Sequence, residues 1–108
     1  MGKNRDRLSI IADILKTANP GCSKTRLMFA ANLSFKLLEK YLATTLNSGL
    51  IKTENSIYVS TEKGRYFLSR YKEFRAQHSK VMRALLDLDS EQEKLNRLVE
   101  EPAPASSV

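Results

Sequence analysis

Hydrophobic residues in the first part of the chain recur with the period of an α-helix. From Arg5 to Ala18 each residue of one apolar set has another member three or four positions away, which predicts one apolar helical face. The face consists of Leu8, Ile11, Ile14, Leu15 and Ala18, and Ile10 widens it. The stretch "NPG" at 19–21 ends the helix. Proline disfavours helical backbone at the residue before it, and glycine permits a turn.

Two more helices are predicted before residue 50. Ser23 can cap a short helix from Lys24 to Ala31, whose inward residues would be Leu27, Met28 and Ala31. After a turn at Asn32-Leu33, Ser34 can cap a third helix. Its predicted buried stripe is Phe35, Leu38, Leu42, Thr45 and Leu46. Gly49 follows where a helix commonly ends in left-handed backbone.

The next residues have the pattern of a β-hairpin. The runs "LIKT" and "IYVS" are strand-like, and the polar "ENS" separates them. Two strands alone are marginally stable in water, so this hairpin must pack on the helices. Thr61 then caps a last helix with Gly64 in its first turn. Because glycine there costs roughly 0.5–1 kcal/mol relative to alanine, we expect Gly64 to permit close packing against the first helix.

The last helix carries a second periodicity. Ten positions follow one another at alternating intervals of four and three residues, which is the heptad repeat of a coiled coil. They are Phe67, Tyr71, Phe74, His78, Val81, Leu85, Leu88, Gln92, Leu95 and Val99. A helix of about 40 residues would be about 60 Å long, more than one small domain can cover. The expected partner is therefore the same helix of a second copy, with Tyr71 to Val99 at the dimer interface.

Charge favours an antiparallel pairing of these helices. Residues 61–88 carry seven Lys or Arg against three acidic residues, whereas 89–108 carry two against five. An antiparallel pair places the basic half of one helix beside the acidic end of the other. One alternative is a break at Ser90, which could form a capping box with Glu93 and start a separate helix. The unbroken heptad phase favours a continuous helix.

The order of elements predicts a mainly α fold with a small β-hairpin. This is a winged helix-turn-helix over residues 5–66, followed by a long C-terminal coiled-coil helix over 61–100. The final "EPAPASSV", residues 101–108, is expected to be disordered.

Composition narrows the function. The net charge of +6 suggests a polyanionic partner. A single Cys and a single His cannot form a disulfide or an ordinary zinc site, and the four dispersed glycines form no phosphate-binding loop. We therefore expect no enzyme activity, no cofactor and no small-molecule substrate. No apolar run is long enough to span a membrane and no secretory segment is evident, so a cytoplasmic location is expected.

Several motifs together resemble a known family. They are "NLS" before the third helix, the spaced residues "L..YL...L..GLI" that end at Ile51, and "T.KG..FL..Y" from Thr61 to Tyr71. They look like the archaeal "ten-a" type of winged-helix, chromatin-associated DNA-binding proteins, over nearly the whole chain. The resemblance implies a homodimer joined by long C-terminal helices. It also implies binding of double-stranded DNA without chemistry, in association with the nucleoid.

The residues expected to contact DNA lie around the helix-turn-helix, because the start of its recognition helix enters the major groove. They are Arg5, Arg7, Lys24, Thr25, Arg26, Asn32, Ser34, Lys36, Leu37, Lys40, Tyr41, Thr44 and, in the wing, Lys52. The centre of the third helix offers no Arg, Asn or Gln to its outward face, which predicts modest sequence specificity and a large electrostatic contribution.

Other binding functions remain open. The role could be that of a transcriptional regulator as well as a chromatin protein. The rival class is a protein-docking winged helix that assembles through its coiled coil, which the acidic residue of the wing turn would suit. RNA binding is less favoured, because the sequence suggests no exposed aromatic platform.

Overall fold

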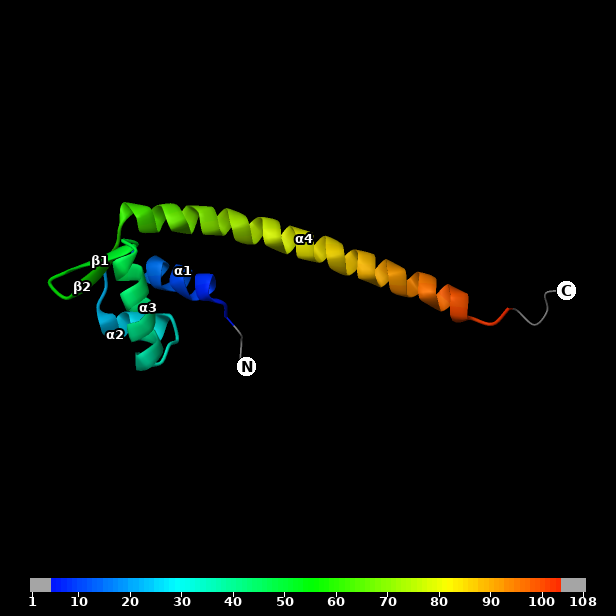
Figure 1. The fold of residues 1–108 in the computed structure, drawn as a ribbon, viewed down its shortest axis with the longest axis horizontal. Coiled ribbons are helices and arrows are strands. Elements are labelled where there is room, and N and C mark those ends of the chain that lie inside the picture. Colours follow the sequence, from blue (N-terminus) through cyan, green and yellow to red (C-terminus); the bar gives the residue numbers. More distant parts are fainter. Residues whose placement is uncertain (1–4, 104–108) are drawn as a thin grey trace. The chain divides into compact units, whose positions relative to one another are not determined.

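The computed structural model describes residues 5–103 and confirms the predicted fold class. Its elements are α1 (Arg7–Ala18), α2 (Lys24–Ala30), α3 (Phe35–Asn47), β1 (Ile51–Glu54), β2 (Ile57–Ser60) and α4 (Glu62–Glu100). The two strands form an antiparallel hairpin. Figure 1 shows α1, α2, α3 and the hairpin gathered into one group. This is a mainly helical winged helix-turn-helix followed by a long helix.

The helix ends follow from local hydrogen bonds. The Ser23 hydroxyl accepts from the backbone N–H of Arg26 at 3.2 Å, and the Ser34 hydroxyl accepts from that of Leu37 at 3.2 Å. Both caps were predicted. The cap of α1 was not: the Asp6 carboxylate accepts from the N–H of Ser9 at 2.8 Å, so the helix begins at Arg7 and not at Arg5.

The core lies between α1, α2, α3 and the hairpin. Its fully buried large apolar side chains are Ile14, Leu15, Leu27, Leu38 and Ile51. Two predictions for α3 were wrong. Phe35 is 60% exposed, and Tyr41, which was expected on the outward face, is 9% exposed and part of the core. Phe35 does share a helical face with Leu38, but it stands at the helix start, beyond the layer that the core covers.

The hairpin is joined to the segment before α2. Its register pairs Ile51 with Ser60 and Glu54 with Ile57. Asn55 and Ser56 turn the chain with φ of 50° and 65°, the left-handed backbone that two-residue hairpin turns require. The Cys22 N–H donates to the Tyr58 carbonyl at 3.0 Å, and the Tyr58 N–H donates to the Cys22 carbonyl at 2.8 Å. Cys22 is buried, and burial raises the pKa of its thiol against the opposing effect of the Arg26 charge.

The start of α4 is tied to the end of α3. The Thr61 hydroxyl donates to the Gly49 carbonyl at 2.6 Å and accepts from the Gly64 N–H at 3.1 Å, which confirms the predicted cap. A Cβ atom at Gly64 would collide with the backbone carbonyl of Leu50 and would lie 3.4 Å from Cδ2 of Leu15. Close packing at Gly64 is as predicted, but the nearest group is this carbonyl and not a group of α1.

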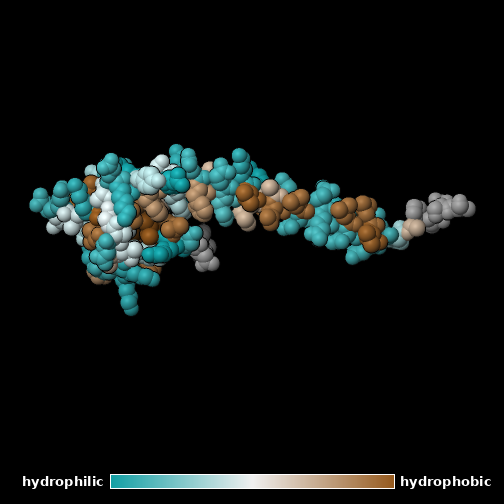
Figure 2. Space-filling view, turned by 45° about the horizontal axis from the view of Figure 1, so that its top comes forward, coloured by the Kyte–Doolittle hydropathy of each residue, from teal (hydrophilic) through white to brown (hydrophobic). Residues whose placement is uncertain are grey.

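The long helix is continuous, with no break at Ser90. By its contacts the chain divides into two compact units, the first ending at Glu73 and the second beginning at Phe74. The boundary expected at residue 66 stays a prediction. Every residue of α4 from Phe74 onward is exposed, and Figure 2 shows hydrophobic patches separated by hydrophilic surface along this segment. Residues 104–108 of the predicted disordered tail lie outside the described residues.

Candidate nucleic-acid interface

The helix-turn-helix is built from α2, a tight turn and α3. Asn32 adopts left-handed backbone with a φ of 55°, and the Leu33 N–H donates to the Met28 carbonyl at 3.1 Å. Ala31, at the turn, is fully buried. Asn32 is exposed and its backbone makes the turn, whereas the Ser34 hydroxyl caps α3. These two predicted contact residues therefore shape the entry to α3.

The first turns of α3 present the predicted basic face. Lys36, Leu37 and Lys40 are all exposed. Thr44 is half-buried, and its hydroxyl donates to the Lys40 carbonyl at 3.2 Å. Tyr41 must be removed from the predicted contacts because it lies in the core, although the Lys40 ammonium lies 5.5 Å from its ring centroid.

Lys24 joins α2 to α3. Its ammonium forms an ion pair with the Glu39 carboxylate and lies 4.8 Å from the centroid of the Phe35 ring. The hydrogen bond to Glu39 is the main cause that raises the pKa of Lys24. A DNA phosphate would have to compete with Glu39 for this ammonium. No sequence pattern indicates this pairing, because the two residues are 15 positions apart.

The other predicted contacts differ in their surroundings. One guanidinium nitrogen of Arg5 donates to the Ala31 carbonyl at 2.6 Å, and the other lies 3.3 Å from the Asp13 carboxylate. Arg5 thus ties α1 to the end of α2, whereas Arg7 is exposed at the start of α1. In the wing, the exposed ammonium of Lys52 lies 3.5 Å from the Glu54 carboxylate.

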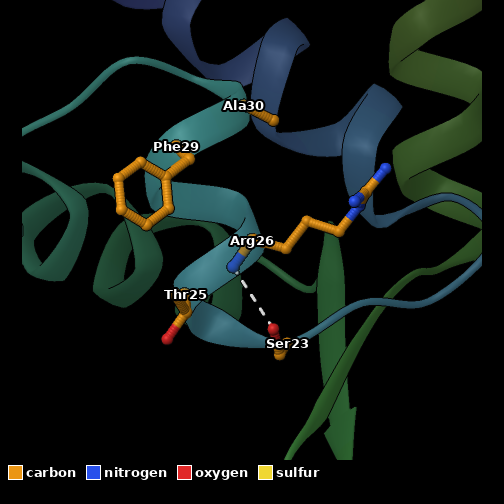
Figure 3. A pocket seen from close by; sticks show the side chains of 5 residues that line it. All are labelled: Ser23, Thr25, Arg26, Phe29 and Ala30. Atoms are coloured by element: carbon orange, nitrogen blue, oxygen red, sulfur yellow. Dashed lines mark hydrogen bonds between the residues drawn. The ribbon is translucent and has the colours of Figure 1, made fainter.

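An open pocket on α2 contains two of the predicted residues. It is lined by Ser23, Thr25, Arg26, Phe29 and Ala30. Figure 3 shows Arg26 and Phe29 extending away from each other, with the backbone N–H of Arg26 bonded to the Ser23 hydroxyl. Phe29 is 72% exposed and was not among the predicted contact residues. The available signal was its position, two residues from both Leu27 and Ala31 and so on the opposite side of the helix from these buried residues.

The apolar heptad positions after residue 73 are open to solvent. Phe74, Val81, Leu85, Leu88, Leu95 and Val99 are between 47% and 83% exposed. His78 and Gln92 are exposed as well, and the rings of Phe74 and His78 lie 5.8 Å apart. In the first unit, Tyr71 is half-buried and its ring stacks on that of Phe67 at 5.8 Å. The predicted dimer face after residue 73 is thus a row of exposed apolar side chains.

Two kinds of feature are absent from residues 5–103. No three His, Cys, Asp or Glu side chains of this part of the chain gather as metal ligands. None of the helices described is long and apolar enough to cross a membrane.

Similar proteins are found by sequence and by structure. Over 70 residues the chain is 36% identical to the uncharacterized protein MJ0290 of Methanocaldococcus jannaschii; the match covers 64% of this chain and 33% of that protein. Over 78 residues it is 33% identical to the uncharacterized protein MJ0287 of the same organism, covering 70% of this chain and 80% of that one. The chain therefore spans about a third of the first relative and most of the second.

Two solved structures share its fold. Sso10a-2, a DNA-binding protein from Sulfolobus solfataricus, has a TM-score of 0.63 and 31% identity, covering 91% of this chain and all of that one. A variant of ZitR from Lactococcus lactis has a TM-score of 0.51 and 22% identity, and the match covers 93% of this chain and 77% of that one. At this identity the likeness shows a shared fold and nothing about function. The sequence profile of the winged helix-turn-helix family matches residues 4–79. The chain belongs to the winged helix-turn-helix family.

Proposed function

We propose that this protein binds double-stranded DNA through α2 and α3, with modest sequence specificity and without catalysis. The observation that carries the proposal is the exposed face of Lys36, Leu37 and Lys40 in the first turns of α3. A helix-turn-helix places that part of its second helix in the major groove, where lysines reach the flanking phosphates. The DNA-binding protein Sso10a-2, which shares the fold, supports the same role.

The contact surface of the proposal is smaller than the sequence suggested. It comprises Lys36, Leu37, Lys40 and the exposed α2 residues Thr25 and Arg26, with Arg7 and Lys52 as outlying charges. Asn32 and Ser34 position the start of α3, and Thr44 lies at the edge of the contact surface. Lys24 contributes to DNA binding only where a phosphate displaces Glu39 from its ammonium. Arg5 belongs to the scaffold.

The second part of the proposal is a homodimer formed by α4. Large apolar side chains at the heptad positions after residue 73 are about half exposed or more, from 47% at Leu85 to 83% at Val99. Burying such a row against a second copy removes apolar surface from water. The basic half and the acidic end of the helix favour an antiparallel pair. A dimer carries two DNA-binding units, which suits a chromatin-type, nucleoid-associated protein or a transcriptional regulator in the cytoplasm.

The experiment that tests DNA binding is a fluorescence-anisotropy titration of a random-sequence duplex of about 20 base pairs at several salt concentrations. We expect the logarithm of affinity to fall steeply with the logarithm of salt concentration, because lysines displace counterions from phosphates. The variant Lys36→Glu/Lys40→Glu should abolish binding. The matched control is Lys80→Glu/Lys94→Glu, which changes the net charge equally at two exposed positions outside the heptad face.

A second candidate is the protein-docking module. The exposed Phe29 on α2, together with Glu54 beside the wing turn, is the observation that favours it. Failure of the wild-type chain to bind duplex DNA even at low salt would reject general DNA binding and turn attention to this role. Equal loss of binding in the control variant would show that net charge alone, and not the face of α3, governs the affinity.

A further inference from the structure

The first turn of α3 presents two apolar side chains to solvent. Phe35 is 60% exposed and Leu37 is 43% exposed, with the exposed Lys36 between them. They follow the cap Ser34 directly, so they occupy the part of the helix that a helix-turn-helix places against base edges. Exposed apolar surface at this position is unfavourable in the free protein and is removed from water when a ligand covers it.

The Phe35 ring is held by two helices. The Lys24 ammonium, from the first turn of α2, lies 4.8 Å from the ring centroid, within the range of a cation–π contact. The same ammonium pairs with Glu39, which stands one helical turn beyond Phe35 in α3. Lys24 therefore acts as a positioning residue for an exposed ring.

The major groove offers these side chains one matching feature. Base edges there carry hydrogen-bond donors and acceptors, together with the C5-methyl group of thymine. Phe35 and Leu37 have no side-chain donor or acceptor, and residues 35–46 include none of the Arg, Asn or Gln side chains that read guanine or adenine in pairs of hydrogen bonds. Resting on the DNA binding proposed above, we propose that Phe35 and Leu37 contact thymine C5-methyl groups and give the protein a preference for thymine-containing sites.

Charge on the same turns argues for a DNA duplex as the ligand that covers these two side chains, which project from opposite sides of the helix with Lys36 between them. Lys36 and Lys40 are exposed beside it, and the Glu39 carboxylate is neutralised by Lys24. A major groove combines phosphates at its edges with apolar methyl groups on its floor, so it matches both the lysines and the two apolar side chains.

The test compares duplexes that differ only in methyl groups. The probes are an A·T-rich duplex of about 20 base pairs and the same duplex with deoxyuridine in place of every thymidine. A second pair is a G·C-rich duplex with either cytosine or 5-methylcytosine. We expect the thymine duplex to be bound more tightly than the uracil duplex. The affinity should differ by roughly fourfold for each methyl group contacted, since burying one methyl group contributes about as much free energy as burying one methylene. Methylated cytosine should likewise be preferred, and the salt dependence should be the same for both members of a pair.

The variant Phe35→Ala/Leu37→Ala should lower the thymine-to-uracil affinity ratio to about one and leave the salt dependence unchanged. Phe29→Ala is the matched control, because it removes an exposed aromatic side chain of α2 and should retain the ratio. Circular dichroism of each variant shows whether its helices remain folded.

The possible results distinguish the proposed thymine-methyl contact from the proposed DNA binding itself. Equal binding of thymine and uracil duplexes by the wild type would overturn the methyl contact and leave DNA binding standing. No binding of any duplex would reject the proposed function itself. Tighter binding of the corresponding single strand than of the duplex would replace methyl recognition with stacking of unpaired bases on the exposed rings.

Discussion

The hydroxyl of Ser60 donates a hydrogen bond of 2.7 Å to the backbone carbonyl of Leu15. It joins the last residue of the hairpin to the inward face of α1, across 45 positions of sequence. Both residues are buried, with Ser60 1% exposed and Leu15 fully covered. The bond therefore fixes the wing on the helical core with two polar groups that water cannot reach.

Ser60→Ala should destabilise the protein by about 1–3 kcal/mol, because it leaves the buried Leu15 carbonyl without this donor. The measurement is the free energy of unfolding in urea at one fixed protein concentration. Ser69→Ala is the control, since Ser69 is exposed on α4 and its removal should change stability little. Equal stability of the two variants would show that the Ser60 bond adds nothing to the fold.

Gly64→Ala should also destabilise the protein, lowering the free energy of unfolding by about 1–3 kcal/mol, because the new Cβ atom would collide with the backbone carbonyl of Leu50. Alanine in a helix ordinarily stabilises relative to glycine by about 0.5–1 kcal/mol, so the sign of the change is decisive. The control is Gly49→Asn. Gly49 has a φ of 78° and open space where a Cβ atom would lie, and asparagine tolerates that backbone. Thermal unfolding of the three proteins makes the comparison, and a higher melting temperature for Gly64→Ala would contradict the close packing.

Glu39→Gln should strengthen DNA binding at low salt. It removes a negative charge from the proposed interface and frees the Lys24 ammonium for a phosphate. The slope of log affinity against log salt concentration should steepen by about one. Glu73→Gln, an equal charge change at an exposed position of α4, should leave the slope as it is. An unchanged slope in Glu39→Gln would mean that Lys24 does not reach the DNA.

The Lys24–Glu39 pair also sets an expected pH dependence. Because the folded-state pKa of Lys24 is raised above its ordinary 10.5, the stability due to its protonation is fully present below that pH. It is lost as the pH rises through the raised pKa. Titration of Lys24 should therefore leave stability unchanged between pH 6 and 9, and unfolding measurements on the wild type and Lys24→Met should differ by a constant amount over this range.

The antiparallel arrangement of α4 can be tested with two single-cysteine additions, because the native Cys22 is buried. In the heptad repeat Tyr71 occupies position a and Leu95 position d, and an antiparallel pair in which a positions face d positions places Tyr71 beside Leu95 of the partner subunit. A mixture of Tyr71→Cys and Leu95→Cys chains should form a mixed disulfide under mild oxidation. Neither variant alone should cross-link, since equal positions would then lie about 36 Å apart along the helices. Cross-linking of Leu95→Cys with itself would indicate a parallel pair.

The helices and strands and their order follow from the sequence alone, because the signals are local. Ser23, Ser34 and Thr61 accept hydrogen bonds from backbone N–H groups three residues further on, and Gly49 supplies left-handed backbone at the end of α3. Such interactions depend on neighbouring residues only. The heptad repeat likewise predicted a continuous α4, including the stretch around Ser90.

Which of these side chains are covered depends on how the elements pack together. Periodicity gives the direction of a side chain around the helix axis, but not whether another element is present at that level. Phe35 shares its face with Leu38 and yet is exposed, whereas the amphipathic Tyr41, at the border of the stripe, is buried. The pairings of Cys22 with Tyr58 and of Lys24 with Glu39 also join residues far apart in sequence, so they exist only once α2, α3 and the hairpin have packed together.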